Sequence, residues 1–271
     1  MSTTTTLPTG PTGWLSVTWR LVDYWITVYR RTWRGSVVTS FLNPLLYVVA
    51  MGVLLGNFIK QPPESLDGAT SYLLFVAPGL LAAQTMQLVF GETTYPVMGM
   101  IKWHKIYASM IATPLTVAQV VCAQLGFIVF RIMTTGFVFI LVMTPFGVWG
   151  SVGGAVGAFF IQLLLGLAFA TPIFAYSAML RSEEGFTVIF RLLMIPMFLF
   201  SGAFFPLHNL PPVLEQIARI TPLWQGVDLT RMLSLGTWDT SSALVHIAYL
   251  VVLAAVGGRL AVHSLATRLR S

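Results

Sequence analysis

The sequence predicts an all-α, polytopic membrane protein with six transmembrane helices. Hydrophobic residues make up 56% of its 271 residues and charged residues only 9%, whereas a soluble domain carries about 25% charged residues. Because a helix rises about 1.5 Å per residue, about 20 apolar residues cross the hydrocarbon core of a bilayer. Six stretches are long and apolar enough to do so: Val37–Ile59, Tyr72–Phe90, Val117–Val142, Val156–Met179, Phe186–Phe204 and Ala243–Ala261.

Basic residues flank these stretches and gather on one side of the membrane if the spans alternate. They are Arg20, Arg30, Arg31, Arg34, Lys102, Lys105, Arg181, Arg268 and Arg270. The positive-inside rule therefore predicts that both termini are cytoplasmic, in the cell (plasma or inner) membrane. This placement accounts for the net charge of +6 through membrane orientation, so we expect the lipid bilayer and no nucleic acid as a partner. The segments outside the spans are too short to form a core of their own.

The N-terminal part divides into two predicted segments. Residues 1–13 are rich in Thr and Pro and lack the charged and apolar regions of a signal peptide, which predicts a disordered cytoplasmic tail. Residues 14–35 form an amphipathic pattern, with aromatic residues outside a basic polar arc, typical of a helix lying in the cytoplasmic interface. This helix is either a simple lipid anchor or an element that also packs on a partner or gate. Residues 36–271 are the transmembrane domain.

Residues 97–114 join the second and third spans on the cytoplasmic side and are longer than a turn requires. Residues Ile106–Thr113 are expected to form a short helix that Pro114 stops. On residues alone, the segment is equally a membrane-surface loop held by Trp103 and two lysines or a docking element for a cytoplasmic partner.

Residues 205–238 lie on the outer side and are too apolar for a solvated loop. Prolines punctuate the segment and predict two short helices, about Pro211–Ile220 and Leu223–Leu235. Backbone at membrane depth must be buried in protein or line a cavity. We therefore expect a re-entrant hairpin dipping into the outer leaflet; the alternative is a small extracellular cap.

Three charges are expected to be embedded in the membrane: Glu92 near the inner end of the second span, Arg131 in the third and Arg191 in the fifth. Arg259 is close enough to the inner end of the sixth span to snorkel to the interface. An arginine near the bilayer centre, such as Arg131, costs roughly 2.5–3.5 kcal/mol on insertion scales, so it should face the bundle interior or a wet cavity. Glu92 could pair with either arginine. Such a pair would hold helices together, or the charges would contact a headgroup or a moving gate.

Catalytic and metal-binding patterns are absent from the sequence. The four histidines (His104, His208, His246 and His263) are scattered, and Cys122 is the only cysteine. No HExxH, GxSxG or paired-cysteine motif occurs, and no GxxxxGK[ST] motif that would bind ATP in a P-loop. We therefore expect no catalytic residue, no metal site and no cofactor in this chain.

The order of these parts resembles the ABC-2 type permease family. The most specific stretch is Met197–Pro206, followed by Leu210-Pro211, Pro222-Leu223, Asp228, Arg231 and Gly236, which is similar to the family's pattern "FLSG…FP…LP…P…D…R…G". The stretches Phe90–Tyr95 and Ala112–Thr116 also resemble nodulation-factor exporter permeases and daunorubicin-type drug exporters. The resemblance covers about Trp14 to Arg270.

The resemblance implies partners that the residues alone do not give. Such permeases form dimers, with an identical or related second subunit, and pair with a dimer of a separate P-loop ATPase that carries ATP and magnesium. The amphipathic helix, with Arg20, Arg30, Arg31 and Arg34, would be a gate helix. The residues that would couple to the ATPase are Lys102, Trp103, His104, Lys105, Ile106, Tyr107, Ser109 and Thr113; relatives often carry a glutamate where this chain has Ala108.

The sequence thus predicts the membrane subunit of an ATP-driven exporter of an amphiphile: a glycolipid, lipid-linked saccharide or hydrophobic drug. Spans one, two and five are expected to form the path. Candidate lining residues are Phe41, Asn43, Tyr47, Gln84, Gln87, Met194 and Phe198, for which packing within the bundle is the alternative. Three other functions stay open: a secondary transporter, a membrane-embedded glycolipid-modifying enzyme using Glu92, and a scaffold without transport.

Overall fold

The computed structural model describes residues 66–270, together with residues 23, 26, 27, 41, 42, 45–47, 49 and 50. No β-strand occurs in these residues, which confirms the predicted all-α class for the part described. The predicted tail (1–13), the four arginines of the gate helix and most of the first span lie outside the described residues.

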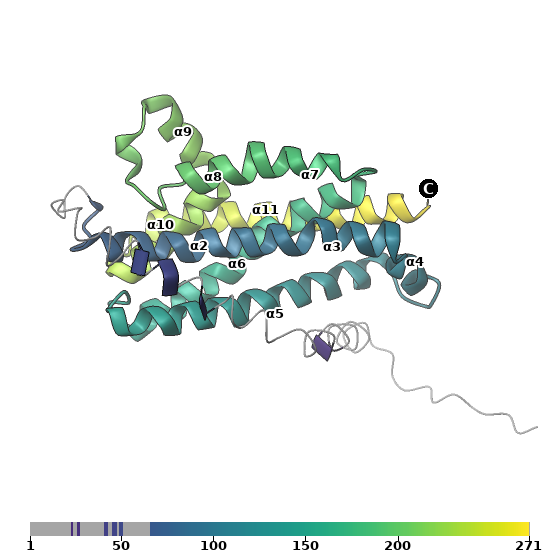
Figure 1. The fold of residues 1–271 in the computed structure, drawn as a ribbon, viewed down its shortest axis with the longest axis horizontal. Helices are drawn as coiled ribbons and strands as arrows, with labels where there is room; N and C mark the ends of the chain where they lie inside the picture. Colours follow the sequence, from purple (N-terminus) through teal and green to yellow (C-terminus); the bar gives the residue numbers. More distant parts are fainter. Residues whose placement is uncertain are drawn as a thin grey trace, which may run out of the picture.

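Among the described residues, four helices are long and apolar enough to cross a membrane. The first joins α2 (Tyr72–Thr93), α3 (Tyr95–Met98) and the π-helical turn η3 (Gly99–Trp103). The second joins α5 (Val117–Met143) and the 3₁₀ turn η4 (Thr144–Phe146), and the others are α6 (Val152–Met179) and α11 (Thr240–Arg270). They correspond to the second, third, fourth and sixth predicted spans and lie side by side in Figure 1.

The fifth predicted span, Phe186–Phe204, differs from the observed helix at both ends. The chain forms α7 (Glu184–Ile189), the π-helical turn η5 (Phe190–Met194) and α8 (Ile195–Phe200), segments of 6, 5 and 6 residues. Together these segments make one helical stretch of 17 residues, at the lower end of the roughly 17–25 residues that cross a hydrocarbon core. The helix ends early because a turn follows at Ser201–Phe205, in which Gly202 has a left-handed φ of 76°.

Helix α6 is the centre of the bundle, since α2, α5, α10 (Pro222–Leu235) and α11 all pack against it. Small residues bring the backbones close, as is typical of helix packing in membranes. A Cβ atom at Gly257 of α11 would lie 2.4 Å from Thr171 Oγ1 and 2.8 Å from the Pro172 nitrogen of α6. Only glycine fits this crossing without a shift of one helix.

A chain of buried side-chain hydrogen bonds joins three helices across the core. Thr85 of α2 donates to Gln162 Oε1 of α6 at 2.9 Å, and Gln162 Nε2 donates to Thr230 Oγ1 of α10 at 3.0 Å. All three residues are buried. Apolar surroundings make an unpaired amide costly, so this network fixes α10 against the spans.

The two short helices predicted in the outer segment are present. After the 3₁₀ turn η6 (Leu207–Asn209), α9 covers Pro212–Ile220 and α10 covers Pro222–Leu235, each within one residue of the predicted bounds. Their surroundings differ: α10 is largely buried, whereas α9 exposes Val213, Ile217 and Ile220. Both lie at the end of the bundle opposite α4 (Ile106–Ile111), as Figure 1 shows.

Candidate transport cleft and coupling surface

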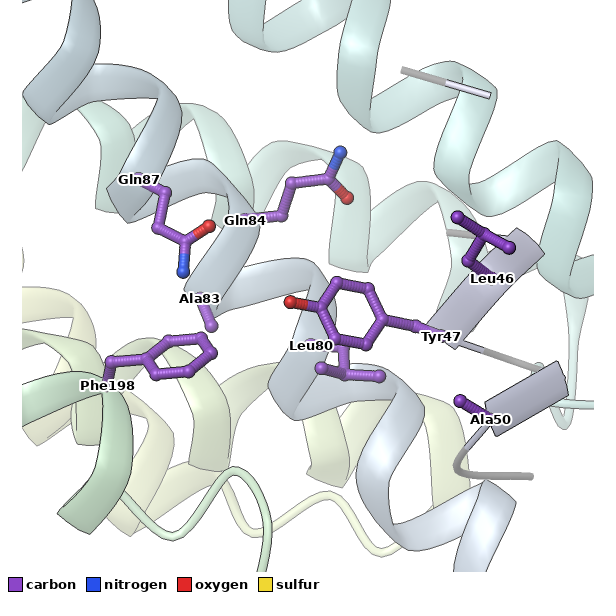
Figure 2. Close-up of a pocket in the computed structure, with 8 residues that line it drawn as sticks. All are labelled: Leu46, Tyr47, Ala50, Leu80, Ala83, Gln84, Gln87 and Phe198. Carbon is purple, nitrogen blue, oxygen red and sulfur yellow. The ribbon is translucent and has the colours of Figure 1, made fainter. Parts of the chain in front are cut away.

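A cleft of about 330 Å³ opens between the segment that carries Tyr47, helix α2 and helix α8. We call it the membrane cleft. Its lining residues are Leu46, Tyr47, Ala50, Leu80, Ala83, Gln84, Gln87 and Phe198. Figure 2 shows Phe198 on one side and Tyr47 on the other, with the side chains of α2 between them. The lining is apolar except for two amides and one phenol.

Four of the seven predicted path residues line this cleft: Tyr47, Gln84, Gln87 and Phe198. Met194 is half-buried and does not line this cleft; like Phe198, it packs against the buried cluster around α6. Its place on the transport path stays a prediction. Phe41 is exposed and does not line the cleft. Asn43 lies outside the described residues.

The amides of Gln84 and Gln87 are the polar feature of the membrane cleft. Gln84 is half-buried and Gln87 is exposed, and neither amide makes a hydrogen bond to another residue of the described portion. Each amide can donate and accept. In an otherwise apolar cleft, these amides are groups with which a polar atom could form hydrogen bonds.

A tight turn, Ser201–Phe205, lies at one end of the membrane cleft. A Cβ atom at Gly79 of α2 would lie only 2.6 Å from Ala203 Cα, so the two backbones touch. The Phe204 ring meets the Phe198 ring edge-on at 4.9 Å, and Tyr72 donates a 3.0 Å hydrogen bond to the Phe204 carbonyl. This turn therefore packs against α2 and against Phe198, which lines the cleft.

Arg231 of α10 holds this turn from behind. Its Nη2 donates to the Gly202 carbonyl at 2.7 Å, its Nη1 lies 3.4 Å from Asp67 Oδ2, and its guanidinium stacks 4.0 Å over the Phe75 ring. Burial lowers the pKa of Arg231 to about 10, against the opposing effect of Asp67 and Asp228. The side chain thus stays charged at neutral pH and joins three separate segments.

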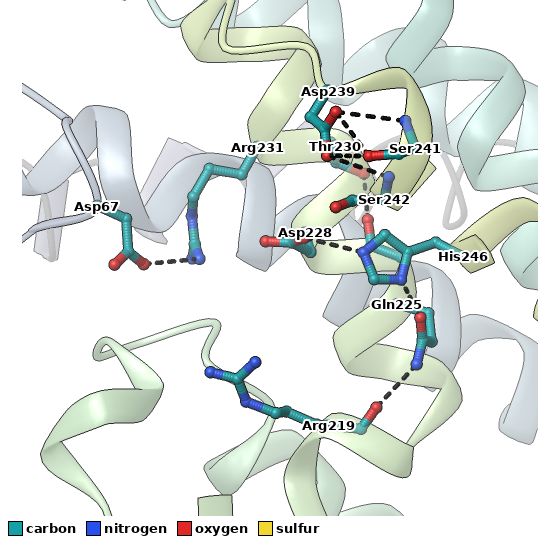
Figure 3. A network of polar contacts seen from close by, with 11 residues as sticks. Asp67, Arg219, Gln225, Asp228, Thr230, Arg231, Asp239, Ser241, Ser242 and His246 are labelled. Atoms are coloured by element: carbon teal, nitrogen blue, oxygen red, sulfur yellow. Dashed lines mark hydrogen bonds and ion pairs between the residues drawn. The ribbon is translucent and has the colours of Figure 1, made fainter. Parts of the chain in front are cut away.

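A second cavity, of about 310 Å³, lies beside Arg231 at the same end of the bundle. We call it the end pocket. It is lined by Asp67, Leu207, His208, Arg219, Trp224, Asp228, Arg231, Ser242 and His246. Figure 3 shows its polar contacts: His246 Nε2 lies 3.1 Å from Asp228 Oδ2, and its Nδ1 pairs with Gln225. Gln225 in turn donates to the Arg219 carbonyl at 2.7 Å.

Sequence reasoning missed the end pocket as a unit. In the sequence, Asp228 and Arg231 stand out only as part of the family pattern, and His208 and His246 are only two of the scattered histidines. The available signal was charge in an otherwise apolar hairpin, since Asp228 and Arg231 follow one another at helical spacing. The partner residues come from elsewhere in the chain, which no spacing reveals.

Of the three charges predicted within the membrane, Glu92 and Arg131 form an ion pair with each other. Arg131 Nε of α5 lies 3.1 Å from Glu92 Oε1 of α2, with both side chains mostly buried. Glu92 therefore pairs with Arg131, and the pair joins two spans. Arg191, in η5, is exposed and has no charged partner among the described residues.

The predicted coupling residues surround helix α4. Lys102, Trp103, His104, Lys105, Ser109 and Thr113 are exposed, and Ile106 is half-buried. Lys105 takes a left-handed φ of 50°, which reverses the chain between η3 and α4. The segment thus projects a polar surface beyond the ends of the spans.

Tyr107 is a correction to the predicted coupling set. Its ring is fully buried beside Phe174 of α6, at a ring distance of 6.3 Å. Burial raises the pKa of Tyr107 far above its usual value. An aromatic residue on α4 was expected to meet a partner, but it anchors the helix to the bundle and so fixes the exposed side chains around it.

Long apolar helices, a cleft at membrane depth and a projecting polar segment define a multi-pass membrane protein of the transport class. Comparison with known families makes this more specific. The family model for ABC-2 type transporters matches residues 16–235, and the chain therefore belongs to this family. It is a membrane subunit of an ABC exporter, as the resemblance predicted.

The curated relatives carry one name. The chain is 28% identical over 249 residues to Nodulation protein J of Rhizobium leguminosarum bv. viciae, covering 91% of both proteins. It is 28% identical over 232 residues to Nodulation protein J of Rhizobium meliloti, covering 82% of this chain and 84% of that one. For Bradyrhizobium diazoefficiens the identity is 27% over 239 residues, covering 85% and 88%. No solved structure matches the chain.

Proposed function

We propose that this permease moves an amphiphilic molecule, such as a glycolipid, lipid-linked saccharide or hydrophobic drug, from the cytoplasmic side outward. The observation that carries the proposal is the membrane cleft, in which Gln84, Gln87 and the phenol of Tyr47 stand in an otherwise apolar lining. An ion-conducting path would need charges, whereas this lining suits a mixed apolar and polar molecule. Three segments meet there, so a change in their spacing would open or close the path.

The energy would come from a separate P-loop ATPase dimer that binds ATP and magnesium. Its docking surface would be the exposed residues around α4, because they project as a rigid unit anchored by Tyr107. A second permease subunit, identical or related, would complete the path. Sequence similarity to Nodulation protein J agrees with an ABC system but leaves the substrate of this chain a proposal.

The membrane arrangement is part of the same proposal. The four long helices, the first predicted span and the Glu184–Phe200 helix would give six spans in the inner membrane, with both termini cytoplasmic. Helix α9 would place Val213, Ile217 and Ile220 in the outer leaflet, and α10 would be the buried arm of a re-entrant hairpin.

Single-cysteine labelling tests this arrangement. Because Cys122 is the only cysteine, Cys122→Ser gives a cysteine-free background. Ser109→Cys, on α4, should react with a membrane-impermeant maleimide only in inverted vesicles, and Thr237→Cys, at the opposite end, only in intact spheroplasts. Added ATPase should protect Ser109→Cys. Labelling of Ser109→Cys from outside would contradict the orientation.

Purification from native membranes tests the energy source. A P-loop ATPase should copurify with the permease, and the reconstituted complex should export an amphiphile only with ATP. Active pumping by the permease alone would favour a secondary transporter. The enzyme alternative loses its candidate acid, since Glu92 is engaged with Arg131.

A further inference from the structure

The end pocket is a second cavity, and none of its lining residues belongs to the membrane cleft. Its walls come from five places in the chain: the Asp67 turn, η6, α9, α10 and the start of α11. The helices α9 and α10, which carry part of its lining, lie at the end of the bundle opposite α4 (Figure 1). Arg231, whose side chain is drawn in Figure 3, also donates to the Gly202 carbonyl. Its volume of about 310 Å³ is at the lower end of the range for small-molecule pockets.

The charges of the end pocket alternate in sign. Asp67 lies between Arg231, at 3.4 Å, and His208, at 3.9 Å. Asp228 faces His246 at 3.1 Å. Arg219 extends from α9 and pairs with Glu215, which does not line the pocket, at 2.7 Å. An anion entering here would meet two carboxylates and a cation two guanidinium groups, so neither sign of charge is favoured.

A neutral ligand whose groups both donate and accept hydrogen bonds suits this lining. Carboxylates accept, guanidinium groups donate, and the Ser242 hydroxyl does both. Hydroxyl groups are the ligand groups that satisfy neighbouring donors and acceptors without bringing charge. A compact array of hydroxyls would therefore bind where a single ion would not.

Trp224 supplies the apolar wall that such a ligand also requires. Its ring is half-buried and meets His246 edge-on at 5.0 Å, and the Arg219 guanidinium lies 5.6 Å from its centroid. With Leu207, the ring gives a C–H surface a place to pack beside the polar groups. An aromatic wall with a few converging polar side chains is typical of small-molecule sites.

We propose that the end pocket binds a neutral polyhydroxyl group, that is, one saccharide unit, as the headgroup of a molecule whose tail lies in the membrane. The inference rests on the proposed export of an amphiphile and adds a place where the headgroup is held. Helix α9 leads from the pocket to an exposed apolar face of Val213, Ile217 and Ile220, where a tail would lie.

The test is binding of maltotriose to the full-length permease in nanodiscs, prepared without glycoside detergents and without ATPase. Isothermal calorimetry should show saturable binding of maltotriose, with glucose 6-phosphate and choline binding at least tenfold more weakly. Trp224→Leu should weaken maltotriose binding at least tenfold. Its control is Trp238→Leu, an exposed tryptophan outside the pocket, which should leave the affinity unchanged.

Asp228→Asn gives a second readout that keeps the pocket's shape. It should lower maltotriose affinity several-fold while the unfolding midpoint stays within the range of the Trp238→Leu control, so a folding failure of Trp224→Leu cannot decide the outcome. No maltotriose binding by the wild type, equal binding of the charged probes, or unchanged affinity in Asp228→Asn would overturn the inference.

These outcomes are separate from those for the proposed function. If the complex with its ATPase exports an amphiphile but the permease binds no saccharide, only the headgroup site fails. If saccharide binds as expected but ATP drives no export, the proposed export function is wrong, whereas the saccharide site in the end pocket still stands.

Discussion

The membrane cleft and the end pocket have similar volumes, about 330 and 310 Å³, but they are built in opposite ways. The cleft is shaped by apolar side chains and close backbone contact, and its polar groups are uncharged. The end pocket is shaped by opposing charges that hold separate segments together. Arg231 binds the Ser201–Phe205 turn, which packs against Phe198 of the cleft, so the charged region is connected to the uncharged one through this turn.

The difference is a physical consequence of position. Within the spans, a charge costs several kcal/mol unless it is paired, as Glu92 and Arg131 are. At the end of the bundle, water reaches Asp67 and Asp228, which are partly exposed, so charges can be held there at lower cost. The two cavities together provide an apolar and a polar surface in one subunit.

The largest expected effect follows from removing the charge that joins the two regions. Arg231→Ala leaves the Gly202 carbonyl and Asp67 without their donor, and it should lower the free energy of unfolding by about 3 kcal/mol, as for other broken buried pairs. SDS titration in mixed micelles measures this. The control is Arg219→Ala, whose exposed pair with Glu215 should contribute less than about 1 kcal/mol. An equal loss of unfolding free energy in the two variants would show that Arg231 does not hold the Ser201–Phe205 turn in place.

The second-largest expected effect is a loss of stability where the backbone of α2 touches the Ser201–Phe205 turn. Gly79→Ala places a methyl group 2.6 Å from Ala203 Cα, and overpacking of this kind costs about 1–3 kcal/mol. Gly91→Ala, on the same helix, meets nothing within 4 Å and should be neutral or slightly stabilising because alanine favours helix. SDS titration compares the two variants. If Gly79→Ala does not change the free energy of unfolding, the Ser201–Phe205 turn moves to accommodate the methyl group.

A smaller effect should appear in transport rather than stability. Gln84→Trp fills the membrane cleft and removes an amide, so ATP-dependent export by the copurified complex should fall about tenfold, or about 1.4 kcal/mol, with little change in unfolding. The control, Val245→Trp, changes an exposed position on α11 that does not line the cleft and should export normally. Normal export by Gln84→Trp would move the path elsewhere.

The smallest effect concerns the edge of the end pocket. Asp239 caps α11 by accepting hydrogen bonds from Ser242 and Ser241, which lower its pKa to about 2. Because the folded pKa lies below the unfolded value of about 3.9, its stabilisation is present above that value and is lost as pH falls toward 2. Asp239→Ala should therefore lower the unfolding midpoint slightly near neutral pH.

Wild type and Asp239→Ala should have nearly the same unfolding midpoint at low pH. Unfolding midpoints of wild type and Asp239→Ala, measured between about pH 5 and about pH 2, should converge as the carboxylate is protonated. A constant difference across this range would show that the carboxylate's charge is not what stabilises the start of α11.

Much of the architecture could be predicted because it depends on local pattern. Apolar length alone located α2, α5, α6 and α11, and prolines located α9 and α10 within one residue. The prediction of the fifth span was less accurate. Its apolar run continues through the Ser201–Phe205 turn, and hydrophobicity does not mark where a helix ends. Glycine at 202 was the local signal.

The candidate site residues also divide into those that local sequence pattern predicts and those that it does not. Gln84, Gln87, Tyr47 and Phe198 could be predicted as lining residues because polar or aromatic residues in apolar spans favour the interior. Met194 has the same local pattern but does not line the cleft, and Tyr107 resembles a partner-facing aromatic but is buried. Which side of a helix faces a cavity is decided by its neighbours.

The sequence by itself determined that this protein crosses a membrane as helices and belongs with ABC-2 permeases, since apolar length and ordered motifs are properties of the chain. Only the tertiary structure decided that Arg131 is the partner of Glu92, that Arg231 clamps the Gly202 turn, and that Asp67, Asp228 and His246 line one pocket. The physical reason is that these contacts join residues far apart in sequence, and their pairing follows from how helices pack around α6.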